Sequence, residues 1–128
     1  MGRCLDKLVM FVVCVICIVA CNHNKRISKD CQTKKIKFDF NFLKENGSHS
    51  KTHQPIEYEF CIPDNETAWE EVSAISPQLK KTSSKGRSKC GSKQILVLGN
   101  TDNKAFKSML CKIANLDYVK EVNQIHWE

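Results

Sequence analysis

The chain has 128 residues, of which 27% are charged, with a formal net charge of +6 and eight cysteines. This length allows one compact domain and excludes a multidomain protein. The positive charge suits an anionic membrane surface or an acidic partner. No aromatic stacking pattern accompanies the lysines, which argues against nucleic-acid binding.

The N-terminus carries the features of an export signal, because an uninterrupted apolar run over residues 8–20 follows Arg3 and Lys7. The run is shorter than the roughly 20 residues that a transmembrane helix needs. It ends in Ile18-Val19-Ala20-Cys21, which resembles the lipobox of bacterial lipoproteins. The resemblance implies lipid attachment at Cys21 and anchoring in the cell envelope, facing the periplasm or the outside. Ordinary secretion and a retained membrane anchor are the alternatives.

The expected division of the chain is a signal peptide over 1–20, a lipid-attachment site and tether over 21–33, and a single domain over 34–128. Besides Cys21, the exported part contains Cys31, Cys61, Cys90 and Cys111. In an exported domain these cysteines predict up to two disulfides, whose connectivity the sequence does not decide. The alternative is that one or two of them are buried thiols.

Two segments alternate between apolar and polar residues and predict half-buried strands. In the first, residues 35–43, one face carries Ile36, Phe38, Phe40 and Phe42. In the second, residues 56–62, the inward residues are Ile56, Tyr58, Phe60 and Ile62, and the outward residues are Glu57, Glu59 and Cys61. The two strands are candidates for an antiparallel pair across a long polar loop, and the outward glutamates are expected to face solvent.

The rest of the chain predicts two helices and two further strands. A helix begins after Asp64 or Asn65, either of which can cap it, and ends before Pro77. Residues 95–99 are apolar on both faces, as in a central strand. A second helix is expected over 103–114, capped by Asn100-Thr101-Asp102. Residues 118–127 predict a last strand with a bulge at 122–124.

This order of elements predicts an α+β fold: a mixed or antiparallel sheet of four to five strands, with two helices on one face. From residue 56 onward the order resembles the ferredoxin-like βαββαβ arrangement, provided that residues 80–93 supply a short strand. Residues 35–43 then form an extra N-terminal strand.

One candidate anion site combines the turn before the second helix with the basic loop that precedes the central strand. Asn100 and Thr101 lie at the expected helix N-terminus, where free N–H groups attract anions. Lys85, Arg87 and Lys89 add positive charge from the loop. The alternative is a capped helix beside a solvated basic loop. The sequence contains neither a P-loop nor a dinucleotide-binding fingerprint.

Enzymatic chemistry is weakly supported, and no cofactor is predicted. Cys90 lies among basic residues that favour a thiolate, but three other cysteines compete to pair with it. His49 and His53 lie in a loop with no cluster of carboxylates or cysteines, so the sequence does not predict a metal site.

The last 70 or so residues resemble a type of small, lysine-rich lipoprotein domain with no assigned function. The motifs that carry this resemblance are Phe60-Cys61-Ile62-Pro63, Ser84-Lys85-Gly86-Arg87, Leu96-Val97-Leu98-Gly99-Asn100-Thr101 and Asn115-Leu116-Asp117-Tyr118. The resemblance implies no named activity. The expected function is a membrane-anchored binding or structural module that contacts an envelope protein or an acidic ligand. The alternative is a secreted, disulfide-stabilised effector or inhibitor of a partner protein.

Overall fold

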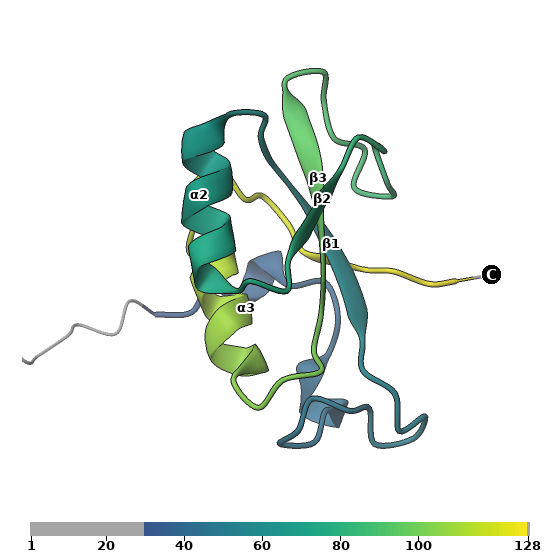
Figure 1. Cartoon of the computed structure of the whole chain (residues 1–128). Helices are drawn as coiled ribbons and strands as arrows, with labels where there is room; N and C mark the ends of the chain where they lie inside the picture. The colour runs from purple at the N-terminus through teal and green to yellow at the C-terminus, as the bar shows by residue number, and fades with distance from the viewer. Residues whose placement is uncertain (1–29, 128) are drawn as a thin grey trace, which may run out of the picture.

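The computed structural model of the chain describes residues 30–127, which fold around a four-stranded antiparallel sheet (Figure 1). The two central strands, β1 (Glu57–Pro63) and β3 (Gln94–Asn100), pair along their whole length. The short strand β2 (Lys80–Thr82) pairs with β3, and β4 (Asn123–Gln124) pairs with β1. The sheet order is therefore β2-β3-β1-β4.

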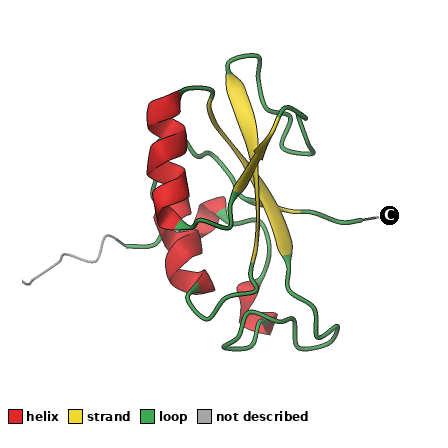
Figure 2. Ribbon diagram, in the orientation of Figure 1, coloured by secondary structure: helices red, strands yellow, loops and turns green. Residues whose placement is uncertain are grey.

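Both α-helices of the described residues, α2 (Glu66–Ile75) and α3 (Phe106–Ala114), lie on the same side of the strands (Figure 2). The elements from β1 to β4 follow the order βαββαβ in one antiparallel sheet, which is the ferredoxin-like arrangement. The predicted α+β fold with two helices on one face is confirmed. The short strand expected within residues 80–93 is β2.

The core lies between the sheet and the helices. The alternation of β1 directs Tyr58, Phe60 and Ile62 into this core, where each is at most 1% exposed. They pack in the same cluster as Val72 of α2 and Leu110 of α3. Complete burial of one such side chain stabilises the fold by about 1.5–3 kcal/mol. This layer therefore fixes how β1 is oriented and which residues its other face presents.

The two helices begin differently. Asn65 caps α2, as predicted, and its side-chain oxygen accepts a hydrogen bond of 2.8 Å from the backbone N–H of Ala68. The predicted start of the second helix is wrong, because α3 begins at Phe106 and its N-cap residue, Ala105, makes no side-chain capping bond. Residues 101–105 instead form an irregular connection that leads out of β3.

The predicted strand over residues 35–43 is wrong. Two 3₁₀ turns, η2 (Thr33–Lys35) and η3 (Phe40–Phe42), occupy this segment. The side chain of Asp39 accepts a hydrogen bond of 2.8 Å from the N–H of Asn41 and so caps η3. Phe42 is 49% exposed rather than inward-facing, and Ile36 makes only a single parallel bridge, to Val122.

The predicted last strand is also shorter than expected. The ladder of β4 covers two residues, because the chain changes partner at Val122. The N–H of Val122 donates to the carbonyl of Lys35, whereas the N–H of Ile125 donates to the carbonyl of Glu57 in β1. Residues 118–121 therefore diverge from β1 instead of extending the sheet.

All four cysteines of the described residues form disulfides, Cys31–Cys111 and Cys61–Cys90. The first ties the start of the described chain to α3, and the second ties a loop to the face of β1 that is turned away from the helices. Two disulfides are compatible with a protein of an oxidising compartment. Cys31, within the segment predicted as a tether over 21–33, is thus bonded to the domain.

The predicted signal peptide, Cys21 and most of the predicted tether lie outside the described residues. Within residues 30–127, no helix has the length and apolar character needed to cross a membrane.

Candidate functional site

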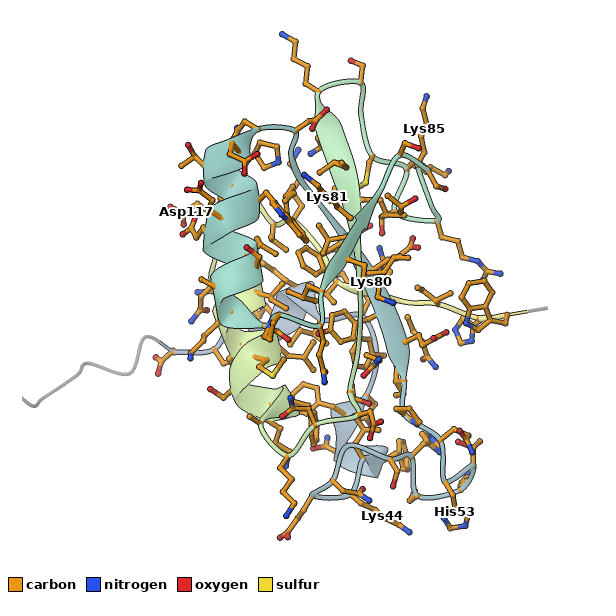
Figure 3. All side chains as sticks on the ribbon, in the orientation of Figure 1. Lys44, His53, Lys80, Lys81, Lys85 and Asp117 are labelled. Carbon is orange, nitrogen blue, oxygen red and sulfur yellow. A yellow bond between two sulfur atoms is a disulfide. The ribbon has the colours of Figure 1, made fainter. Side chains whose placement is uncertain are left out.

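Positive charge is concentrated in residues 80–93, which contain six basic and no acidic side chains. These side chains are Lys80, Lys81, Lys85, Arg87, Lys89 and Lys93, and all of them are exposed. Lys80 and Lys81 lie on the edge strand β2, and Lys85 lies in the loop that follows it (Figure 3). We call residues 83–93 the basic loop. The other described residues contain more acidic than basic side chains, so the domain is electrically asymmetric.

The basic loop is fixed to the open face of the sheet at two neighbouring points. Cys90 is bonded to Cys61 of β1. Two residues earlier on the same strand, Glu59 accepts hydrogen bonds from the N–H of Ser88 (2.7 Å) and from its hydroxyl (3.1 Å). Glu59 is only 4% exposed, so the prediction that its carboxylate faces solvent is wrong. The loop covers it.

A polar network extends from this carboxylate to the other edge of the sheet. The side-chain amide of Asn123 donates to the hydroxyl of Ser88 and to the carboxylate of Glu121, both at 3.0 Å. Gly86 allows the loop to approach closely, because its φ is +61° and a Cβ there would lie 2.6 Å from Leu96. The basic loop is therefore held against β1 and β4 by covalent, polar and steric constraints.

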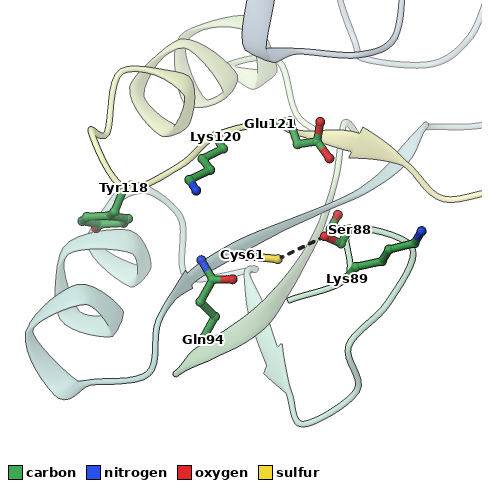
Figure 4. Close-up of a pocket in the computed structure, with 7 residues that line it drawn as sticks. All are labelled: Cys61, Ser88, Lys89, Gln94, Tyr118, Lys120 and Glu121. Carbon is green, nitrogen blue, oxygen red and sulfur yellow. Dashed lines mark hydrogen bonds between the residues drawn. The ribbon is translucent and has the colours of Figure 1, made fainter. Parts of the chain in front are cut away.

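A polar pocket of about 280 Å³ lies between the basic loop and the segment that leads to β4. Cys61 of β1 contributes to its lining (Figure 4). The other lining residues are Ser88 and Lys89 of the basic loop, Gln94 of β3, and Tyr118, Lys120 and Glu121. The pocket exists because residues 118–121 diverge from β1 while the loop rises over its open face.

Two hydrogen-bond donors point into this pocket from opposite sides, the amino group of Lys120 and the amide nitrogen of Gln94 (Figure 4). The N–H of Gly91 donates to Gln94 Oε1 at 2.8 Å, and this bond fixes which end of the amide faces the pocket. Within residues 30–127, Lys120 has no hydrogen-bond or ion-pair partner. The arrangement is suited to an anionic group with two acceptor oxygens.

Tyr118 lies on the same side of the pocket as Lys120, but its hydroxyl is already hydrogen-bonded to helix α2. Its hydroxyl donates to Glu71 of α2 at 2.8 Å. Burial, and then this hydrogen bond to a carboxylate, raise the pKa of Tyr118 above its ordinary value. The phenol therefore stays protonated and holds the start of the 118–121 segment against α2, so this wall of the pocket keeps its place.

The turn that was predicted to bind an anion together with the basic loop has a structural role. Thr101 is fully buried; its hydroxyl donates to the carbonyl of Gly47 at 2.6 Å and accepts from the N–H of Ile56 at 2.9 Å. The side chain of Asn100 accepts from the N–H of Asp102 at 3.0 Å. These contacts join the turn to the 44–55 loop, not to the basic loop.

The basic residues of the predicted anion site lie at the opposite end of β3, in the loop that precedes Gln94. Lys85, Arg87 and Lys89 all belong to the exposed basic loop, and Arg87 donates to the carbonyl of His126 at 3.0 Å. Only Lys89 lines the pocket beside Gln94. The structure thus brings Lys89 together with Gln94 and residues 118–121, and places Asn100 and Thr101 elsewhere.

The other residues considered for chemistry have structural partners. Cys90 is disulfide-bonded and therefore has no thiolate. His49 accepts from the N–H of Lys51, and His53 lies 3.3 Å from the amino group of Lys44. Among residues 30–127, no group of three His, Cys, Asp or Glu side chains is arranged to hold a metal ion.

Sequence reasoning did not find Gln94, Tyr118 or Lys120, because no motif or spacing connects Gln94 with residues 118–120. The only signal for the pocket is indirect: the pairing of Cys61 with Cys90 places the basic loop over β1. No protein-family model, curated protein or solved structure matches this chain.

Proposed function

We propose that this protein is a lipid-anchored binding module of the cell envelope, which uses its basic loop to hold an acidic partner. The observation that carries the proposal is the double attachment of the loop, through Cys61–Cys90 and through the buried carboxylate of Glu59. Both attachments hold the exposed cations of the loop in one place.

Such attachment is physically significant because a segment with only positive charges repels itself and gains entropy by spreading into solvent. Binding by a mobile loop must overcome the backbone entropy lost when the loop becomes ordered, about 1–2 kcal/mol for each residue fixed. A loop that is already fixed loses less on binding and presents its charges in a defined pattern.

The anchor is tested by mass spectrometry of the mature N-terminus. Lipidation predicts a chain that begins at Cys21 and carries a diacylglyceryl group. A free, unmodified N-terminus would remove the anchor from the proposal and favour a secreted, disulfide-stabilised effector or inhibitor. The two disulfides are equally compatible with both forms.

The binding role is tested with a charge-matched pair of triple variants. One replaces Lys85, Arg87 and Lys89 of the basic loop with serine, and the other replaces Lys104, Lys107 and Lys112, which are exposed at and near α3. We expect poly-glutamate to bind the wild type and the second variant at moderate salt, and to bind the first variant at least tenfold more weakly. Equal losses in the two variants would show that only net charge matters, and would contradict the proposal.

A further inference from the structure

We infer that the pocket beside the basic loop receives an extended, acidic segment of a protein partner, with one carboxylate held between Lys120 and Gln94. The inference rests on the proposed binding function and names its partner class. Its basis is the convergence of two donors on one cavity, next to a strand edge that the sheet leaves open.

The donor pair is suited to a carboxylate. The amino group of Lys120 supplies charge, and the amide of Gln94 supplies a neutral, oriented donor because Gly91 fixes its other end. The acidic side chain in the pocket wall, Glu121, already accepts a hydrogen bond from Asn123. Glu121 keeps its negative charge, but Lys89 and Lys120 give the lining two positive charges against this one, and an entering carboxylate meets donors at two points.

The neighbouring backbone is suited to an extended peptide. The carbonyl of Glu57 accepts a hydrogen bond from the N–H of Ile125, so the backbone groups of Glu57 face the β4 edge. The backbone groups of alternate residues in a strand face the same edge, so those of Glu59 and Cys61 face β4 as well. The β1–β4 ladder ends at Glu59. Cys61 therefore presents its N–H and C=O to the pocket rather than to a strand, and an extended segment can pair with them as an added strand does.

The shape and position of the pocket favour a protein partner over a lipid surface. Lys120 is exposed, but the Gln94 amide is half-buried within the pocket, where a side chain can reach and a flat layer of headgroups cannot. The basic loop also lies on the face of the sheet opposite α3, where Cys31 attaches the start of the described chain (Figure 1). A tether leading from Cys31 to a membrane would thus leave from the helix side, with the pocket on the far face.

The test uses the mature protein with both disulfides intact and, as probe, a peptide of about ten alternating Glu and Thr residues. Binding is followed by backbone amide NMR shifts and by hydrogen exchange of the Cys61 N–H. We expect shifts centred on residues 61, 88–94 and 118–121, and slower exchange at Cys61. Lys120→Gln and Gln94→Glu, which keeps the acceptor for Gly91, should each weaken binding about fivefold, whereas Lys112→Gln should leave it unchanged.

The outcomes separate this inference from the proposed function. If the probe binds through the basic loop but Lys120→Gln and Gln94→Glu have no more effect than Lys112→Gln, the pocket is not the receptor and the inference fails alone. If the probe does not bind the wild-type protein, both fail. Tight binding to phosphatidylglycerol vesicles that depends on Lys120, without binding of the peptide, would replace the protein partner by a lipid headgroup and overturn the inference.

Discussion

Replacing Glu59 with alanine should remove one of the two attachments of the basic loop to β1 and leave the Cys61–Cys90 disulfide as the other. The carboxylate accepts two hydrogen bonds from Ser88 beneath the loop, at 2.7 and 3.1 Å, and is 4% exposed. A hydrogen bond to a charged group contributes about 1.5–3 kcal/mol, but Ser88 is only half-buried and water can reach it when the carboxylate is gone. We therefore expect the free energy of unfolding to fall by about 2 kcal/mol.

Urea denaturation of the oxidised protein measures this change, and hydrogen exchange of the Ser88 amide locates it. Glu57→Ala is the matched control, because Glu57 lies two residues away on the same strand face and is exposed. The control should cost less than about 1 kcal/mol and leave exchange at Ser88 unchanged. If the two variants have the same stability and the Ser88 amide is equally protected in both, the carboxylate does not hold the loop.

Three further predictions concern the core, the loop and the disulfide. Burial raises the pKa of Tyr58 from 10.0 to about 12, so the unfolded chain loses the phenol proton at a lower pH than the folded chain. The contribution of Tyr58 to the free energy of unfolding is therefore complete below pH 10 and falls by about 2 kcal/mol towards pH 12. Tyr58→Phe should flatten this decline when denaturation is measured as a function of pH. Gly86→Ala should lower the melting temperature by several degrees, because φ at this position is +61° and the added Cβ would meet Leu96 and the Glu59 carboxylate. Gly91→Ala is the control: its Cβ would have no neighbour nearer than 3.5 Å, so the melting temperature should not change. Replacing both Cys61 and Cys90 with alanine should reduce the free energy of unfolding by about 3–4 kcal/mol, the loop-closure entropy for a separation of 29 residues; a loss below 1 kcal/mol in denaturant titrations would contradict that estimate.

The elements that the sequence predicts well are those whose signals are local. Asn65 caps α2 because its side chain reaches the N–H of Ala68 within the same turn. Residues 95–99 are apolar on both faces because β3 lies between β1 and β2, with the helices on one face and the basic loop over part of the other. Together with the order of the remaining elements, these signals were sufficient for the fold class.

Residues 35–43 show how a local pattern can mislead. Their strict alternation is that of a strand, but a strand needs a free edge to pair with, and β4 occupies the nearest part of the β1 edge. The start of the segment is also held at α3, through Cys31–Cys111 and a hydrogen bond from Gln32 to Asn115. The chain therefore turns twice in 3₁₀ conformation and buries Ile36 and Leu43 without a ladder.

The burial of Glu59 and the pocket were not predictable for a different reason. Alternation along β1 correctly places Glu59 on the face away from the core, but it contains no information about a loop that returns 29 residues later to cover that face. Knowledge of the cysteine pairing would have predicted that the loop covers Glu59, but the sequence leaves the pairing open. The same holds for Gln94 and Lys120, which meet through tertiary structure alone.

The two disulfides are nested: Cys61–Cys90 lies entirely within the loop that Cys31–Cys111 closes. If the thiols were oxidised in the order in which they follow one another from the N-terminus, Cys31 would pair with Cys61, and Cys90 with Cys111. Assembly of β1 and β3 before Cys31 reacts favours the native pairs, and thiol–disulfide exchange can correct a wrong first pairing. Sheet formation thus selects the inner disulfide, because it places Cys61 of β1 beneath the loop that carries Cys90.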